Sequence, residues 1–219
     1  MTSPRKRVVV FISGGGSNMM ALVAAAKAPD FPAEIVGVIS DKPDAGGLAK
    51  AAAEGIATFA FARKDYASKE AHEEAIFAAL DALSPDVLCL AGYMRLLSGT
   101  FIQRYEGKMI NIHPSLLPLF PGLHTHQRAI DAGMRIAGCT VHFVTEGMDE
   151  GPVIGQAAVP VLSDDTADAL AARVLTVEHQ IYPQALKLFA EGKVRMEGGK
   201  AVRTAGASDT TATGAVISA

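Results

Sequence analysis

The chain has 219 residues, of which 49% are hydrophobic and 20% charged, so it can bury a sizeable core in one compact domain. Its formal net charge of −3 provides no overall basic field for nucleic acid or for an anionic membrane. A site for small molecules is therefore favoured over a groove for a polymer.

The N-terminus and the cysteines indicate a protein of the reducing cytoplasm. A basic cluster precedes an apolar run, but this run of about five residues is shorter than the apolar region of a signal peptide, and no span approaches membrane length. Cys89 and Cys139 lie far apart and beside apolar residues, which favours two buried thiols over a disulfide or a metal site.

Short apolar runs alternate with Ala-rich amphipathic segments in the first half of the chain. Strands are predicted at residues 7–12, 34–40, 57–61, 86–92 and 108–112, and helices at 17–28, 45–55, 68–83 and 98–107. Ser17, Ser68 and Ser98 are predicted helix N-caps, and Gly55 and Gly107 helix stops. The continuous apolarity of the strands indicates that both of their faces are covered. We therefore predict an α/β fold: a Rossmann-like open twisted sheet, mostly parallel, with helices on both faces.

The pattern changes after Gly138, where strand-like segments follow each other too closely for a crossover helix. An antiparallel addition to the sheet is predicted there. A long helix should follow over residues 163–192, capped by Ser163, with Asp164 and Asp165 at its positive end and Pro183 kinking or dividing it. We expect a small hairpin at 194–203, a single domain over 1–203 and a mobile tail over 204–219.

The stretch "SGGGSN", residues 13–18, joins the first strand to the first helix. Its glycines let backbone N–H groups approach a ligand, and the helix N-terminus adds a positive dipole, so the stretch is suited to a phosphate. It lacks the Lys of a Walker loop, and Met19 stands where a dinucleotide fingerprint needs a small residue, although Asp41 could mimic a ribose-binding acid. A turn without a ligand is the alternative.

The stretch "MINIHPSLLPLFPGLHTH", residues 109–126, ends an apolar strand with two polar side chains. Asn111 and His113 share one face because side chains two apart in a strand point the same way. At the carboxyl end of a parallel strand, an amide and an imidazole could hold a developing oxyanion. Three prolines would stiffen the loop behind them, and the Leu117 to Pro118 bond is a candidate for the cis form. A structural core histidine is the alternative.

A carboxylate near His113 would favour its charged form. The best candidates are Asp149 and Glu150 in "TEGMDEGPVI", because Gly147 and Gly151 allow this loop to fold back over the sheet; a solvated acidic turn is the alternative. A zinc site built from histidines is disfavoured because no complete ligand spacing is present, and no metal is expected.

These motifs together resemble the phosphoribosylglycinamide formyltransferases. The segments that carry the resemblance are "ISGGGSN", "LAGYMRLLS", "MINIHPSLLPLFPGLHTHQRAIDAG", "GCTVHFVTEGMDEGPVI" and "RVLTVEHQIYP". The resemblance covers residues from Arg7 to about Arg195. It implies the formyltransferase fold and transfer of a formyl group from 10-formyltetrahydrofolate to the amine of 5'-phosphoribosylglycinamide in purine biosynthesis.

The resemblance also implies roles for individual residues. The catalytic set would be Asn111, His113 and Asp149. Residues holding the substrate phosphate and ribose would be Gly16, Ser17, Asn18, Leu175, Thr176, Val177 and Glu178. Folate would be bound by Lys69, Met94, Arg95, Leu96, Leu97, Asn111, Thr145, Glu146, Gly147, Met148 and Asp149.

Two positions depart from the family pattern. Gly15 stands where the family usually has Asn, which removes a side chain but no backbone donor. Lys69 stands where the family often has Arg, and a Lys cannot reproduce a bidentate contact.

Three other functions share part of this pattern. A methionyl-tRNA formyltransferase would carry a basic C-terminal domain for tRNA, and a formyltetrahydrofolate hydrolase a regulatory domain before Arg7. A nucleotide-binding module without catalysis would leave Asn111, His113 and Asp149 unused. We expect small-molecule substrates, no nucleic acid or membrane partner, and a monomer or homodimer in the cytoplasm.

Overall fold

The computed structural model describes residues 4–204, which form two compact units divided between Asn111 and Ile112. Residues 205–219 of the predicted tail lie outside the described residues, and the single-domain expectation stays a prediction. Within residues 4–204, no helix is both long and apolar enough to cross a membrane.

The first unit contains parallel strands, as the continuous apolar runs predict. In chain order the described strands are β1 (Lys6–Ile12), β2 (Ala33–Ser40), β3 (Thr58–Ala60), β4 (Val87–Leu90) and β5 (Met109–His113). Their spatial order is β3-β2-β1-β4-β5, and neighbouring strands pair in parallel. Residues Val8 to Ile12 are fully buried, so β1 is covered on both faces. The end of β5 extends past the division between the units.

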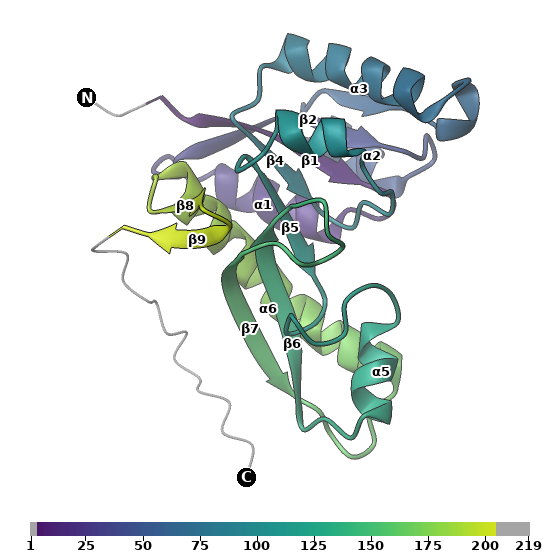
Figure 1. Ribbon diagram of the computed structural model, residues 1–219, viewed down its shortest axis with the longest axis vertical. Coiled ribbons are helices and arrows are strands. Elements are labelled where there is room, and N and C mark those ends of the chain that lie inside the picture. Colours follow the sequence, from purple (N-terminus) through teal and green to yellow (C-terminus); the bar gives the residue numbers. More distant parts are fainter. Residues whose placement is uncertain (1–3, 205–219) are drawn as a thin grey trace. The chain divides into compact units, whose positions relative to one another are not determined.

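Helices connect these strands. They are α1 (Ser17–Ala26), α2 (Gly46–Ala53), the 3₁₀ turn η1 (Arg63–Asp65), α3 (Lys69–Leu83) and α4 (Gly99–Arg104). Figure 1 shows α1 and α3 on opposite faces of the sheet, as right-handed crossovers in opposite directions along the sheet require.

In the first unit the predicted N-caps were right at two helices and wrong at one. Ser68 and Ser98 each accept a hydrogen bond 3.1 Å long, from Ala71 N and Phe101 N. Ser17 is the first residue of α1 and not its cap, because Gly16 takes the cap position in a left-handed conformation with φ 67°. The chain therefore enters α1 through a turn that glycine adopts without strain.

The second unit contains the predicted antiparallel strands. β6 (Ile136–Phe143) pairs antiparallel with β7 (Val153–Pro160), and β8 (Val194–Glu197) with β9 (Lys200–Arg203). The helices are α5 (Thr125–Asp131) and the longer α6 (Ala167–Ala190). The expected fold class, mostly parallel with antiparallel strands toward the C-terminus, is confirmed.

The start of α6 differs from the prediction. Thr166, not Ser163, is the N-cap and accepts a hydrogen bond from Ala169 N at 3.1 Å. Asp165 instead receives two hydrogen bonds from Arg173, at 2.7 and 2.8 Å. These bonds, together with one from the Leu162 N–H, lower the pKa of Asp165 to about 2. α6 continues past Pro183 as one helix, so the proline does not divide it.

Candidate active site

The loop that follows β5 is fixed by hydrogen bonds to the antiparallel strands. Thr140 Oγ1 on β6 donates to Ser115 O at 2.7 Å and accepts from Leu117 N at 3.0 Å. Gln156 on β7 donates to Leu117 O at 2.8 Å. The bond between Leu117 and Pro118 is cis. The hydrogen bonds from Thr140 and Gln156 therefore hold the loop backbone against the strands in addition to the stiffness that its prolines provide.

His113 ends β5 and faces oxygen atoms with both ring nitrogens. Its Nε2 lies 3.1 Å from the carbonyl oxygen of Phe120, which can only accept, so Nε2 donates in this contact. Its Nδ1 lies 3.4 Å from Asp149 Oδ2, and the side chains of His113 and Asp149 are 7% and 13% exposed. A protonated ring would direct both N–H groups at oxygens, so the geometry is suited to an imidazolium.

Asp149 is held in place by its own loop. It has a left-handed backbone with φ 58°, and its Oδ2 accepts a hydrogen bond from Gly122 N at 2.8 Å. The loop returns to β6 at Gly151, where a Cβ would lie 1.7 Å from Phe143 O. The predicted role of Gly151 is thus confirmed, because a residue with a side chain could not make this close return.

His142 is a second histidine near Asp149. Its Nε2 lies 3.8 Å from Asp149 Oδ1, and its Nδ1 donates to Phe143 O at 2.8 Å. Burial has the largest effect on the pKa of His142 and lowers it. The hydrogen bond to the Phe143 carbonyl and the charge of Asp149 raise this pKa, whereas the charge of His113 lowers it, and the net direction is downward. His142 is therefore favoured as a neutral neighbour of the pair formed by His113 and Asp149.

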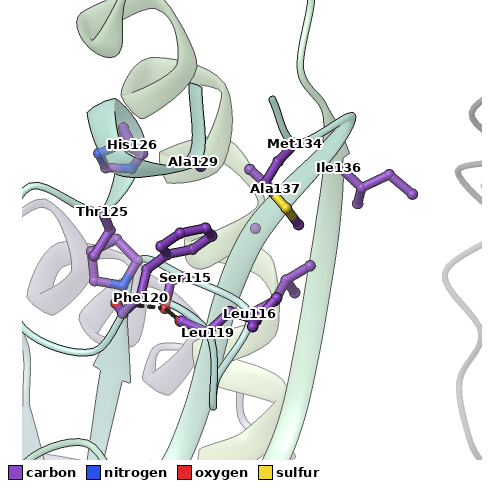
Figure 2. Close-up of a pocket in the computed structure, with 12 residues that line it drawn as sticks. Ser115, Leu116, Leu119, Phe120, Thr125, His126, Ala129, Met134, Ile136 and Ala137 are labelled. Carbon is purple, nitrogen blue, oxygen red and sulfur yellow. Dashed lines mark hydrogen bonds between the residues drawn. The ribbon is translucent and has the colours of Figure 1, made fainter. Parts of the chain in front are cut away.

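A narrow apolar pocket lies behind the loop between β5 and α5. Figure 2 shows Leu116, Phe120 and Met134 in its wall, with His126 at one end. Its free volume is about 10 Å³, which is space for one water molecule at most. The pocket is too small for a substrate, and its walls serve to pack the loop.

The glycine-rich loop, residues 13–18, packs closely against α2 in the first unit. Gly16 packs against Gly47 of α2 so closely that a Cβ on Gly16 would lie 3.0 Å from Gly47 Cα. Gly47 N donates to Gly14 O at 3.0 Å, and the Lys50 ammonium donates to Gly15 O at 2.9 Å. Among the described residues no side chain caps α1, so its first N–H groups can serve an anion.

A pocket of about 280 Å³ in the first unit gathers most of the folate residues predicted for that unit, but Asn111, which was also predicted, does not line it. It brings Lys69 together with the segment Met94–Leu97, and Arg63 adds a cation that the sequence analysis did not single out. Met94 and Leu96 are 61% and 69% exposed despite being apolar. The pocket thus combines apolar contact surface with positive charge.

The remaining predicted residues lie in the second unit. Leu175, Thr176, Val177 and Glu178 belong to α6, where Glu178 is buried and Thr176 is exposed and donates to Arg173 O at 2.7 Å. Thr145, Glu146, Gly147 and Met148 lead to Asp149 in the loop after β6, with Met148 54% exposed.

Besides Arg63, sequence reasoning missed three features of the site. Gly122 donates to Asp149, His142 lies beside Asp149, and Ser13 is hydrogen-bonded to Asp41 at 2.5 Å. The first two depend on how the loops that carry Gly122 and Asp149 fold in space, and the sequence carries no signal for this. The third had a signal, because Ser13 follows β1 and Asp41 follows β2, and the ends of neighbouring parallel strands meet at one edge.

The fold and the match described next show that the chain belongs to the formyl transferase family. The family model "Formyl transferase" matches residues 6–186. The expected resemblance to the phosphoribosylglycinamide formyltransferases is confirmed.

Three similar proteins illustrate the relationship. A solved structure of phosphoribosylglycinamide formyltransferase from Brucella melitensis is 74% identical, with a TM-score of 0.83, over 85% of this chain and 96% of that one. The phosphoribosylglycinamide formyltransferase of Escherichia coli is 46% identical over 86% of this chain and 89% of its own length. The trifunctional purine biosynthetic protein adenosine-3 of Bos taurus is 49% identical over 88% of this chain, which spans only 19% of that protein.

Proposed function

We propose that the chain is a phosphoribosylglycinamide formyltransferase that transfers the formyl group of 10-formyltetrahydrofolate to the amine of 5'-phosphoribosylglycinamide. The observation that carries this proposal is the contact between His113, at the end of β5, and Asp149, whose Oδ2 lies 3.4 Å from His113 Nδ1. Similarity to enzymes of this name over most of the chain supports it.

The proposed mechanism uses Asn111, His113 and Asp149. The substrate amine attacks the formyl carbon, a carbon–nitrogen bond forms, and the carbonyl oxygen gains charge. β5 carries Asn111 and His113 two residues apart, so both can donate hydrogen bonds to this oxyanion. For this the His113 Nε2 exchanges its bond to Phe120 O for one to the substrate.

Asp149 has two tasks in this mechanism. Its carboxylate stabilises the imidazolium of His113 across 3.4 Å. It also takes up, through water, the proton that the attacking amine loses and passes it on to N10 of the folate as the bond between N10 and the formyl carbon breaks. The step needs no metal ion and no covalent enzyme intermediate.

The pocket around Met94–Leu97 fits the folate co-substrate. Met94 and Leu96 offer apolar surface for a flat heterocycle, and Arg63, Lys69 and Arg95 offer charge for the glutamate carboxylates. The resemblance also assigns folate contacts to Thr145–Asp149, which belong to the second unit. Gly16, Ser17 and Asn18 would bind the substrate phosphate, and Leu175–Glu178 its ribose.

We also propose that the protein works in the cytoplasm as a monomer or homodimer on small molecules, without nucleic acid. Both cysteines are buried and neither forms a disulfide, in keeping with a reducing compartment.

An acceptor assay tests the proposed function. The protein is supplied with 10-formyltetrahydrofolate and with phosphoribosylglycinamide, charged initiator tRNA or water as acceptor. We expect turnover with phosphoribosylglycinamide, and a loss of about a hundredfold or more in His113→Ala at unchanged melting temperature. Turnover only with tRNA or water, or near-normal activity of His113→Ala, would overturn the proposal.

A further inference from the structure

The segment Met94–Leu97 is attached at its first residue to the end of β1. The Ser13 hydroxyl accepts a hydrogen bond from Met94 N at 2.8 Å and donates one to Asp41 Oδ1 at 2.5 Å. Ser13 N also donates to Gly92 O at 3.2 Å. Ser13 and Asp41 are only 5% and 8% exposed, so water competes little for these bonds.

The residue that follows the segment is held in a similar way. Ser98 N donates to Glu73 Oε1 at 2.8 Å, and the Ser98 hydroxyl donates to Glu73 Oε2. Glu73 is 5% exposed. A buried carboxylate therefore anchors each end of the segment, directly at Ser98 and through Ser13 at Met94.

Between these anchors the side chains point outward. Met94 and Leu96 are largely exposed, and Arg95 lies 3.8 Å from Asp41 Oδ2 with 38% of its side chain exposed. A firmly held backbone that presents apolar and cationic side chains to a pocket is what ligand recognition requires, because small displacements of contact groups weaken binding. Burying a carboxylate is costly, which favours a role for these anchors beyond general packing.

We propose that Ser13 and Asp41 are positioning residues for folate, which set the backbone of Met94–Leu97 and thereby the affinity for the co-substrate. The identity of the ligand rests on the proposed function, whereas the anchoring of the segment rests on the hydrogen bonds described above. Asp41 is therefore not a ribose-binding acid of a dinucleotide site, since its carboxylate is buried and engaged by Ser13.

Substitutions of Ser13 and Asp41 should affect folate binding according to the hydrogen bond that each one removes or keeps. Ser13→Ala removes the acceptor of Met94 N, and Asp41→Ala removes the group that orients the Ser13 hydroxyl. Asp41→Asn keeps an oxygen that accepts from Ser13, so it should restore binding. Asp44→Ala, on the same loop but exposed, is the matched control for loss of a carboxylate.

The test measures the Kd of 5-formyltetrahydrofolate by calorimetry, the KM of each substrate and the hydrogen exchange of the Met94 amide. We expect Ser13→Ala and Asp41→Ala to raise the folate Kd and KM at least about fivefold, with faster exchange at Met94. The KM for phosphoribosylglycinamide should change less than about twofold. Asp41→Asn and Asp44→Ala should stay within about twofold of the wild type on both substrates.

Two results would overturn the inference: an unchanged folate Kd in Ser13→Ala, or an equal rise of both KM values, which indicates a general structural role. If Asp41→Ala does not fold, Ser13→Ala and Asp41→Asn carry the comparison. Absence of transfer to phosphoribosylglycinamide by a wild-type protein that still binds folate would refute the proposed function and leave this inference standing.

Discussion

Asp149 Oδ2 lies 3.4 Å from His113 Nδ1, and the same oxygen accepts the Gly122 N–H at 2.8 Å. The carboxylate is therefore oriented by a backbone donor before any substrate arrives. Because the Asp149 backbone is left-handed, with φ 58°, only a few residue types fit there without strain. The proposed acid–base pair is thus determined by loop geometry as much as by the two side chains.

Asp149→Asn should lower kcat for formyl transfer by roughly tenfold to a thousandfold while leaving the melting temperature nearly unchanged. Asn tolerates the left-handed conformation and can still accept from Gly122, but it cannot stabilise a charged His113 or take up a proton. Steady-state kinetics with a thermal melt would check this. The matched control is Glu150→Gln, the exposed acid next in the chain, which should keep near-normal kcat; the opposite ranking would move the role to Glu150.

Gly16→Ala should impair binding of the substrate phosphate. The added Cβ would lie 3.0 Å from Gly47 Cα, at a residue with φ 67°, so the strain should cost roughly 1–2 kcal/mol of unfolding free energy. Distortion of the glycine-rich loop should also raise the KM for phosphoribosylglycinamide about tenfold or more and reduce the rise in melting temperature with inorganic phosphate.

Gly14→Ala is the control for that variant, because a Cβ on Gly14 meets nothing within 4 Å. It should bind phosphate as the wild type does. Equal phosphate affinity of the Gly14 and Gly16 variants would place the phosphate elsewhere.

The strands could be predicted because burial on both faces leaves continuous apolar runs, as in β1 and β4. Most helices could be predicted from the Ala-rich amphipathic segments between these runs. The helix starts were less certain, since several residues near each start can act as caps. At α1 the left-handed Gly16 displaced Ser17, and at α6 the bond between Asp165 and Leu162 N moved the start to Thr166. Such choices depend on contacts that a local pattern does not contain.

The candidate site, too, could be predicted only in part. Strand periodicity indicated Asn111 and His113, and the resemblance selected Asp149 over Glu150. The position of Asp149 beside His113 required the return of the loop at Gly151, which a glycine permits but does not specify. The link from Ser13 to Asp41 was within reach, since both residues directly follow adjacent parallel strands.

Lys69→Ala should raise the KM for folate about tenfold, because the pocket would lose one of the cations that we propose pair with the glutamate carboxylates of folate. Lys69→Arg should bind at least as tightly as the wild type, since a guanidinium can pair with a carboxylate in a bidentate way. The KM of each variant should be measured at two ionic strengths, because screening weakens such contacts. Lys64→Ala removes an exposed cation outside the pocket and should behave as the wild type; a similar rise there would indicate a nonspecific charge effect.

The histidines predict how stability depends on pH. Burial lowers the pKa of His126, where the charge of His113 adds to the effect, and burial alone lowers that of His179. Between these lowered values and the ordinary value of 6.5, the unfolded chain binds more protons than the folded chain. The stability that these two neutral histidines contribute should therefore be complete above about pH 6.5, and the free energy of unfolding should fall as the pH decreases below that value.

Urea unfolding at pH 7.5, 6.5 and 5.5 measures this free energy. The double variant His126→Gln/His179→Gln should show a smaller decrease than the wild type. His124→Gln, at an exposed position, serves as the control; an equal decrease in the double variant and the wild type would assign the pH dependence to other groups.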